Sequence, residues 1–218
     1  MTQEKVRYIE LLPHEFRKRL AERPVAYLPL GTLEWHGEHL PLGSDAIISE
    51  GLMIRCARQL GGIVMPPIHL GPDRARLMPG GTCQQGMEYA EQTKPPRQLD
   101  GNCYWVPRGF FISLIDMILA QLKRAGFKAV FADGHGPSRW SWVENIPERE
   151  SLLDIKLFGV TDDIKDAWPT QIDHAARNET SLMLALRPEW PDLTRLPNDP
   201  DVWPQAVLGD DPDRKSVV

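Results

Sequence analysis

The stretch that decides the fold is Pro24-Val-Ala-Tyr-Leu-Pro-Leu30 followed by Gly31-Thr-Leu-Glu34-Trp-His36-Gly-Glu-His-Leu-Pro-Leu-Gly-Ser-Asp45. Its first part is an unbroken apolar run that ends at a glycine. Such a run is typical of a strand in a parallel sheet whose two faces are both covered. Apolar residues then recur at helical spacing over residues 46–60. The stretch therefore predicts a buried strand, a polar loop at its carboxyl end and a helix.

Strands and helices continue to alternate along the chain. Further strands are expected at residues 63–65, 128–132 and 157–160, and further helices at 109–125, 138–149 and 178–187. Lys123 and Arg124 lie in the last turn of the helix at 109–125, and Gly126 follows as a helix stop. Asn178 is the expected N-cap of the helix at 178–187. This alternation predicts an α/β fold with a mostly parallel sheet between helical layers.

The composition limits the class of protein. The 218 residues fit one domain, and 42% hydrophobic with 25% charged residues is ordinary for a globular chain. The net charge is −5 without a basic stripe, so nucleic acid is not an expected partner. No apolar run has the length of a membrane span or a signal-peptide core, and the three cysteines do not suggest a disulfide framework. We expect a single cytoplasmic domain over residues 1–218, with no membrane partner.

Polar side chains gather after three of the predicted strands. They are Glu34, His36 and Asp45 after the first, Asp133 and His135 after the strand at 128–132, and Asp173, His174 and Glu179 after the last. Ligands of open α/β sheets bind at the carboxyl ends of strands. Glu34 and His36 are two residues apart, which puts both side chains on one side of an extended backbone. Asp45 starts a helix, where the dipole favours an anion, and its carboxylate could bridge two cations.

This set of residue types points to a metal. Imidazole with carboxylate suits zinc, manganese or iron, and two such cations about 3.5–4 Å apart form a common hydrolytic device. Each residue also has a simpler explanation, as part of a polar loop, as a Gly-His-Gly turn or as a helix cap. Placement at successive strand ends favours the metal site, and the residues by themselves leave both interpretations open.

Three motifs resemble those of the creatininase (creatinine amidohydrolase) family. The first is Glu34-Trp-His36-Gly-Glu-His-Leu-Pro-Leu-Gly-Ser-Asp45, which is similar to the family's Glu-x-His-Gly-x-His-Leu-Pro-x-x-x-Asp. The second is Asp133-Gly-His135-Gly136, beside the family's Asn-Gly-His-Gly-Gly-Asn. The third is His174-Ala-Ala-Arg-Asn-Glu179-Thr180-Ser181, beside His-Ala-Gly-x-x-Glu-Thr-Ser. The motifs occur in the family's order, and the resemblance covers roughly residues 20–190.

The resemblance implies a fold, a cofactor and roles for single residues. The fold is a three-layer αβα sandwich, commonly assembled as a homo-hexamer. Glu34, His36, Asp45 and His135 are then ligands of two divalent cations, with Asp45 bridging, and His174 is the acid/base for the leaving group. The implied reaction is attack by a metal-bound hydroxide on a carbonyl of a small cyclic substrate.

The sequence departs from the family in the second motif. Creatininase has a glutamate ligand two residues after the motif's histidine, where this chain has Pro137. Glu179 could replace that ligand, or it could satisfy backbone N–H groups at a helix start, and both interpretations stand. Asp133 replaces the usual asparagine, and we expect it to orient His135, as carboxylates do for ligating imidazoles.

The segment Met78–Arg108 is longer than in the family, and residues 71–108 lack clear periodicity. It is expected to be an inserted loop, either a lid, a subunit contact or a plain surface insertion. Tyr104 and Trp105 in it, with Trp140 beyond it, are candidate substrate-binding residues, since aromatic faces stack on rings. The neutral polar side chains of the segment suit a hydroxylated ring, which favours a branch resembling 3-dehydro-scyllo-inosose hydrolase and a role in inositol metabolism.

Three functional classes remain open from the sequence. The first is the metal-dependent hydrolase of a cyclic amide or an inositol-derived diketone. The second is a metal-dependent isomerase or dehydratase of a sugar-like ketone, in which the same cations hold an enediolate. The third is a non-catalytic descendant that binds a ligand. Retention of the four ligands and His174 favours an enzyme.

Overall fold

The central feature is a parallel sheet of four strands in a computed structural model that describes residues 4–81, 83–89, 104–164, 166–167, 173–199 and 206–209. The strands are β1 (Val25–Leu30), β2 (Ile63–Val64), β5 (Ala129–Gly134) and β6 (Lys156–Gly159). Their order is β2-β1-β5-β6, and every pair is parallel. The four strands are those expected from the sequence, so the prediction of an α/β fold with a parallel sheet is confirmed.

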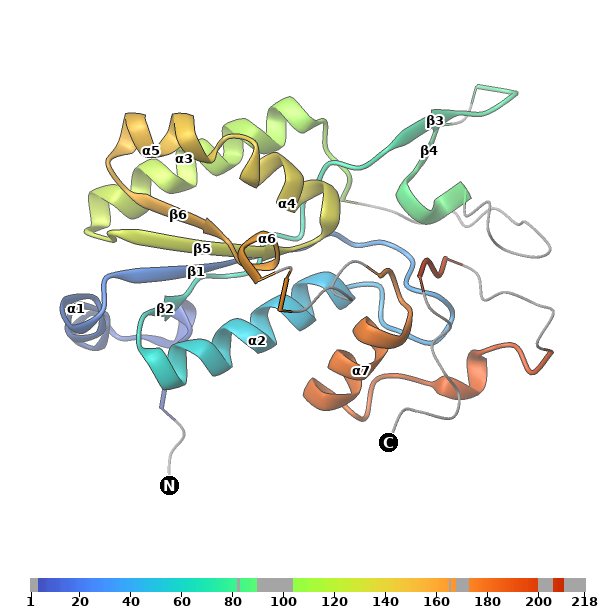
Figure 1. Ribbon diagram of the computed structural model, residues 1–218, viewed down its shortest axis with the longest axis horizontal. Helices are drawn as coiled ribbons and strands as arrows, with labels where there is room; N and C mark the ends of the chain where they lie inside the picture. Colours follow the sequence, from blue (N-terminus) through green and yellow to red (C-terminus); the bar gives the residue numbers. More distant parts are fainter. Residues whose placement is uncertain are drawn as a thin grey trace.

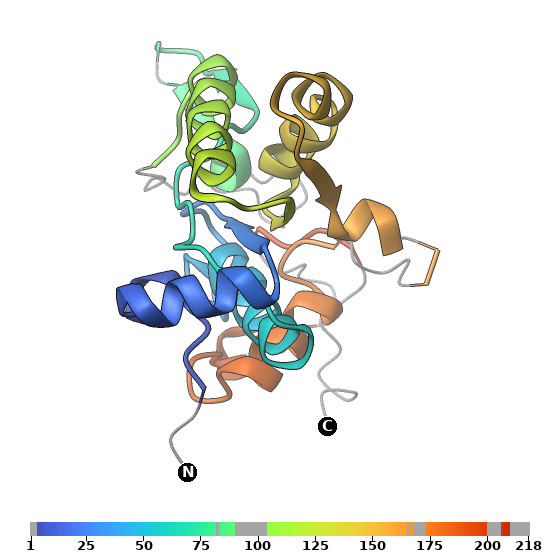
Figure 2. The ribbon, with the colours of Figure 1, turned by 90° about the vertical axis from the view of Figure 1, so that its left-hand side faces the viewer.

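Helices cover both faces of this sheet (Figures 1 and 2). The first layer holds α3 (Arg108–Ala125), α4 (Gly136–Val143) and α5 (Ile146–Leu153). The opposite layer holds α2 (Ser44–Leu60), with α7 (Arg177–Leu186) packed against its outer side. The short α6 (Val160–Ile164) follows β6 directly, which is why that strand ends one residue earlier than predicted. The three-layer αβα arrangement is thereby confirmed.

The two faces of β1 show how the core forms. Alternate residues of a strand point to opposite faces, so Leu28 and Leu30 pack in the cluster that contains Ile115 of α3. Tyr27 points the other way and packs with Met53 of α2. All of these side chains are buried. The unbroken apolar run of the sequence thus serves two cores, one on each side of the sheet.

Besides α6, one further helix was not predicted, and one predicted helix is divided. The first is α1 (Pro13–Glu22), which begins with proline at a first-turn position and uses the Glu15 carboxylate to accept the Leu12 N–H (2.7 Å). The second is the helix expected at 138–149, which the structure divides into α4 and α5. Pro147 lies in the first turn of α5, where a missing N–H is tolerated, so the chain restarts there.

The start of α7 also differs from expectation. The helix begins at Arg177, so Asn178 lies inside its first turn and is not the N-cap. The Asp173 carboxylate accepts the Asn178 N–H instead (2.8 Å). A carboxylate at this end suits the helix dipole. Asp173 therefore caps the start of α7, whereas the sequence predicted Asn178 in that role.

Part of the region 71–108, which lacks clear periodicity and contains the expected inserted loop, is regular. β3 (Ala75–Leu77) and β4 (Cys83–Gln85) form an antiparallel hairpin, and the 3-10 helix η2 (Gly86–Tyr89) follows. Figure 1 shows the hairpin standing away from the central sheet. All three residues of β3 are exposed. Tyr104 and Trp105 belong to the described residues, whereas residues 90–103 of the expected loop lie outside them.

Two further 3-10 helices lie near the ends of the chain, η1 (Tyr8–Glu10) and η3 (Leu193–Arg195). No helix in the described ranges is long and apolar enough to cross a membrane.

Candidate metal centre

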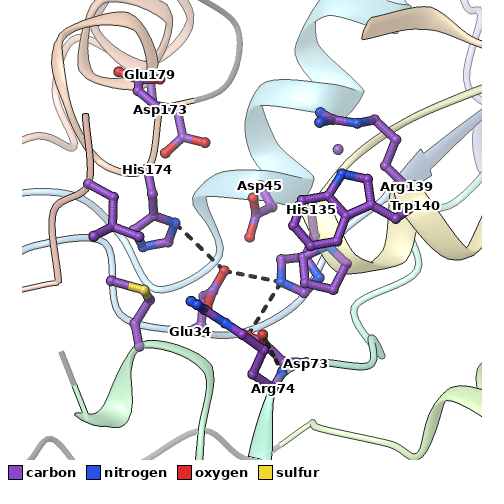
Figure 3. Close-up of a pocket in the computed structure, with 15 residues that line it drawn as sticks. Glu34, Asp45, Asp73, Arg74, His135, Arg139, Trp140, Asp173, His174 and Glu179 are labelled. Carbon is purple, nitrogen blue, oxygen red and sulfur yellow. Dashed lines mark hydrogen bonds and ion pairs between the residues drawn. The ribbon is translucent and has the colours of Figure 1, made fainter. Parts of the chain in front are cut away.

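The candidate site lies at the carboxyl edge of the parallel sheet, in a cavity of about 490 Å³ (Figure 3). The loop after β1 supplies Glu34 and His36, and His135 follows β5 directly. Asp45 lies in the first turn of α2, and Glu179 in the first turn of α7. Each predicted ligand therefore sits at a strand end or a helix start, where short loops hold it.

The first group of donor atoms consists of His36, Asp45 and Glu179. The Nε2 atom of His36 lies 3.6 Å from Oδ2 of Asp45 and 3.7 Å from Oε2 of Glu179. The Nδ1 atom of His36 faces the backbone carbonyl of Glu34 (3.2 Å). A carbonyl can only accept, so Nδ1 carries a proton, and Nε2 is the ring nitrogen that faces the two carboxylates.

The second group consists of Glu34, Asp73 and His135. The Nε2 atom of His135 lies 3.3 Å from Oε1 of Glu34 and 3.6 Å from Oδ2 of Asp73. Figure 3 shows Glu34 and Asp73 on the same side of His135. Each of the two groups therefore pairs one imidazole with two carboxylates.

The partner that orients His135 is Ser138, and the prediction that Asp133 does so is wrong. The Nδ1 atom of His135 lies 3.0 Å from the Ser138 hydroxyl. The Asp133 carboxylate instead accepts the hydroxyl of Thr161 (2.7 Å). Asp133 belongs to β5 and its side chain projects toward α6, whereas His135 already caps α4, so the two side chains diverge.

Glu179 satisfies a backbone N–H group, as one interpretation of the sequence predicts, and it also faces the donor group. Its Oε2 atom accepts the backbone N–H of Ala175 (2.6 Å) and is the same atom that faces His36. A carboxylate oxygen has more than one lone pair, so it can accept a hydrogen bond and face a cation together. The geometry places Glu179 in the donor group, and its role as a ligand stays a prediction.

His174 lies beside the two groups. Its ring packs against that of His36, with centroids 4.3 Å apart. The Nε2–H of His174 donates to the carbonyl of Trp35 (2.7 Å), which leaves the lone pair of Nδ1 facing Oε1 of Glu34 at 3.9 Å. Burial and the neighbouring His36 lower the pKa of His174 to about 3, so the ring is neutral.

The two histidines of the donor groups titrate differently from His174. Burial lowers the pKa of His36, but Asp45 and Glu179 outweigh it and raise that pKa to about 10. Burial is likewise outweighed at His135, where Glu34 and then Asp73 raise the pKa to about 9. Without a cation these imidazoles hold protons, and a metal must displace them because only neutral imidazole is a ligand.

The pKa values of the carboxylates in the site also shift in two directions. Burial raises the pKa of both Glu34 and Glu179 above the usual range. Burial also acts to raise the pKa of Asp45, but the charge of His36 outweighs it and holds that pKa well below the usual range. The net charge of these buried carboxylates and imidazoles therefore depends on the protons or cations that they bind.

The donor atoms fit divalent cations. Nε2 of His36 and Oδ2 of Asp45 are buried and have no hydrogen-bond partner among the described residues. Two ligand atoms at about 2.1 Å from one cation lie about 3–3.5 Å apart, close to the 3.3–3.7 Å separations found here. Unpaired buried polar atoms are costly, so a cation explains why this arrangement is stable.

The candidate substrate-binding residues take different places. Trp140 lines the cavity and is 55% exposed. Trp105 lies behind the cavity wall, where its indole N–H donates to the carbonyl of Asp73 (3.3 Å). Tyr104 is 48% exposed, and neither it nor Trp105 is among the described residues that line the cavity. Contact of these three side chains with a substrate stays a prediction.

Sequence reasoning missed several residues of the cavity. They are Asp73, Arg74 and Arg139. Asp73 follows Gly71-Pro72 in the segment after β2, so the rule that strand ends carry ligands applies to it as well. The sequence places Asp73 in the region 71–108, which lacks clear periodicity, and so gives no signal for it.

Comparisons with known proteins find similarity to creatinine amidohydrolases. The family model "Creatininase: Creatinine amidohydrolase" matches residues 10–93. A creatinine amidohydrolase of Pseudomonas putida is 28% identical over 94% of this chain and 82% of its own length. A manganese creatininase structure has a TM-score of 0.64 at 25% identity, over 90% of this chain and 79% of that one. A creatininase variant of the Zn–Zn type has a TM-score of 0.68 at 23% identity, over 91% and 79%, and shows the shared fold.

The structure is an α/β fold with a parallel sheet that carries candidate metal donors at its carboxyl edge. Within this fold class, the chain is similar to proteins of the creatininase family. The resemblance found in the three motifs is thereby confirmed.

Proposed function

We propose that the chain is a hydrolase that uses two divalent cations, zinc, manganese or iron, to open a small ring at a carbonyl carbon. The primary substrate class is the cyclic amides. An inositol-derived diketone such as 3-dehydro-scyllo-inosose is the second class, because the neutral polar side chains of residues 84–105 suit a hydroxylated ring. A cytoplasmic homo-hexamer remains the expected setting.

One observation carries the proposal. Two donor groups, each with one imidazole and two carboxylates, lie beside a neutral histidine. This histidine forms a further donor group with Glu34 and His36, and all of these residues except His36 line one cavity. A two-cation site needs this many donors, and an acid/base catalyst must lie within reach of the reacting atoms. His174 is the central residue, since its ring contacts His36 of one group and its Nδ1 faces Glu34 of the other.

The residues divide the work by their chemistry. His36, Asp45 and Glu179 would hold one cation, and Glu34 and His135 would hold the other. When bound, such cations polarise a carbonyl and lower the pKa of water. Trp140, exposed at the cavity wall, offers a flat apolar face to a ring-shaped substrate.

His174 has the tautomer that proton transfer needs. Its Nε2 proton is committed to the carbonyl of Trp35, so Nδ1 is the atom that can gain a proton. The attacking water loses a proton as it bonds to the carbonyl carbon, and Nδ1 can accept it. The same Nδ1–H then protonates the leaving atom when the ring bond breaks, which returns His174 to its neutral state.

The test joins metal content with ring opening. Purified protein is analysed for zinc, manganese and iron, and is then assayed on a panel of small cyclic amides and 3-dehydro-scyllo-inosose in water enriched in heavy oxygen. We expect about two cations per chain and one solvent oxygen in each product molecule. An isomerase or dehydratase would consume a substrate without that incorporation.

The variant His36→Ala is expected to lose cations and activity, and His69→Ala serves as its control because His69 is exposed in the loop after β2. A chain that binds no cation even when zinc and manganese are supplied would overturn the proposal.

A further inference from the structure

We propose that Asp73 is a metal ligand, and that it supplies the second carboxylate of the donor group around His135. The inference rests on the proposed two-cation function and adds a residue to its site. It concerns the second donor group, in which Glu34 and His135 are the ligands implied by the family resemblance.

One oxygen of the Asp73 carboxylate accepts a backbone hydrogen bond, and the other oxygen faces the site. Oδ1 accepts the backbone N–H of Arg74 (2.6 Å), which fixes the plane of the carboxylate. Oδ2 lies 3.6 Å from Nε2 of His135, a separation that suits two ligands of one cation. The side chain is only 10% exposed, so water does not offer the easy solvation that a surface aspartate has.

The hairpin segment holds Asp73 against the site from one side. A Cβ atom at Gly86 would lie 2.1 Å from Oδ2 of Asp73 and 3.1 Å from Oε2 of Glu34. Gly86 also has φ +54°, a conformation that side chains rarely adopt. Its N–H donates to the carbonyl of Arg74 (2.8 Å). Only glycine lets the backbone come this close to two carboxylates.

The segment before α3 holds Asp73 from the other side. The indole N–H of Trp105 donates to the backbone carbonyl of Asp73 (3.3 Å), and the N–H of Val106 donates to the carbonyl of Gly71 (3.1 Å). Residues toward both ends of the segment Met78–Arg108 therefore donate hydrogen bonds to the short stretch 71–74. This is a support for a ligand, in addition to any role as a lid over the cavity.

Charge balance gives an independent reason for a fourth carboxylate. Glu34, Asp45, Asp73 and Glu179 together carry the negative charge that two divalent cations neutralise. Buried charges that are not neutralised cost several kcal/mol, so the number of carboxylates matters. Pro137 cannot supply one, and among the described residues Asp73 is the carboxylate within reach of both Glu34 and His135.

The experiment compares cation affinity in the whole chain. Asp73→Asn keeps the size of the side chain and an oxygen for the Arg74 N–H, but it removes the charge. Zinc is titrated into metal-free protein in competition with a coloured chelator, which resolves two binding steps. We expect one step to stay as in wild type and the other to weaken by at least about 10-fold, the effect known even for indirect supports of ligands.

Two controls make this result specific. Asp163→Asn removes an exposed carboxylate on α6 and is expected to leave both steps unchanged. Gly86→Ala should weaken the same step as Asp73→Asn because it displaces Oδ2, whereas Gly109→Ala, whose Cβ meets nothing within 4 Å, should not. Far-UV circular dichroism in chelator checks that each variant is folded, and Gly86→Ala decides the question if Asp73→Asn is not.

The outcomes separate this inference from the proposed function. Two wild-type binding steps that persist unchanged in folded Asp73→Asn, or in Gly86→Ala where that variant decides, would overturn the ligand role and leave the two-cation function intact. A wild-type chain that binds no zinc would overturn both.

Discussion

The two donor groups of the site differ in what holds them. His36, Asp45 and Glu179 are fixed by the loop after β1 and by the first turns of α2 and α7, all of which pack on the sheet or on each other. In the other group, Asp73 precedes a hairpin whose first strand is fully exposed. One half of the site thus belongs to the framework of the fold, and the other half depends on a segment that precedes an exposed hairpin.

If Asp73 is a ligand as proposed, the hairpin half takes one donor from a segment other than the strand ends and helix starts that supply the rest. Pro137 lies at the start of α4, where proline fits the helix well but offers no ligand. Asp73 approaches His135 from a different segment at 3.6 Å. The following predictions test how far the framework half and the hairpin half act independently.

The largest effect is expected from the framework half. Asp45→Ala removes a buried carboxylate that faces His36 at 3.6 Å and leaves that imidazole without its nearest anion. The cations supply several kcal/mol of transition-state stabilisation, so losing them costs on the order of 10³-fold or more in rate. Elemental analysis and ring-opening rates measure both losses. Retention of both cations and of full activity would show that Asp45 is only a helix-start residue.

The next largest effect concerns the residue that lies between the two halves. His174→Ala is expected to lower kcat by about 10²–10⁴-fold, the usual contribution of an acid/base, while both cations remain bound. Single-turnover rates and metal content are measured on the same sample. Loss of the cations in this variant would make His174 a ligand, and an unchanged kcat would exclude it from catalysis.

A smaller effect is expected from the support of His135 in the hairpin half. Ser138→Ala removes the hydroxyl that lies 3.0 Å from Nδ1 and fixes the ring. Zinc affinity at one of the two steps should fall by roughly 10–100-fold. The matched variant is Ser113→Ala, which removes a hydroxyl that bonds only to its own helix and should not change zinc binding. Equal effects of the two variants would refute a specific role for Ser138.

The smallest effect is expected from the contact between Trp105 and Asp73. Trp105→Phe keeps an aromatic ring but removes the N–H that donates to the Asp73 carbonyl. One such hydrogen bond is worth about 0.5–1.5 kcal/mol, so zinc affinity at the hairpin step should change by about 10-fold at most. Chelator competition measures it, and a change at the other step instead would show that the two halves are not independent.

The sequence predicted the framework well because its signals are local. The apolar run of β1, the helical spacing after Asp45 and the glycine after α3 each follow from the residues concerned. The ligands at the ends of β1 and β5 follow from the same reasoning. The family motifs then pointed to His174 and Glu179, which no local pattern would have joined to His36.

The remainder depended on contacts between distant segments. Asp73 belongs to the candidate site because it lies close to His135, and Gly86 is important because its backbone approaches Asp73. Neither contact produces a periodic pattern in the sequence. Asp133 misled because a carboxylate two residues before a histidine looks like its partner, whereas the strand directs that side chain to Thr161. The partners of these residues follow from their distances in the folded chain, which the sequence alone does not give.

The exposed hairpin gives the hairpin half a further property, which is thermodynamic linkage. If the cation holds Asp73 and Asp73 adjoins β3, then binding at this position and closure of the hairpin must favour each other to the same extent. Cutting of the exposed turn at Gly80-Gly81 by a protease should therefore slow as zinc is added. The rate of cleavage in the exposed hairpin would then show whether the buried cation is bound.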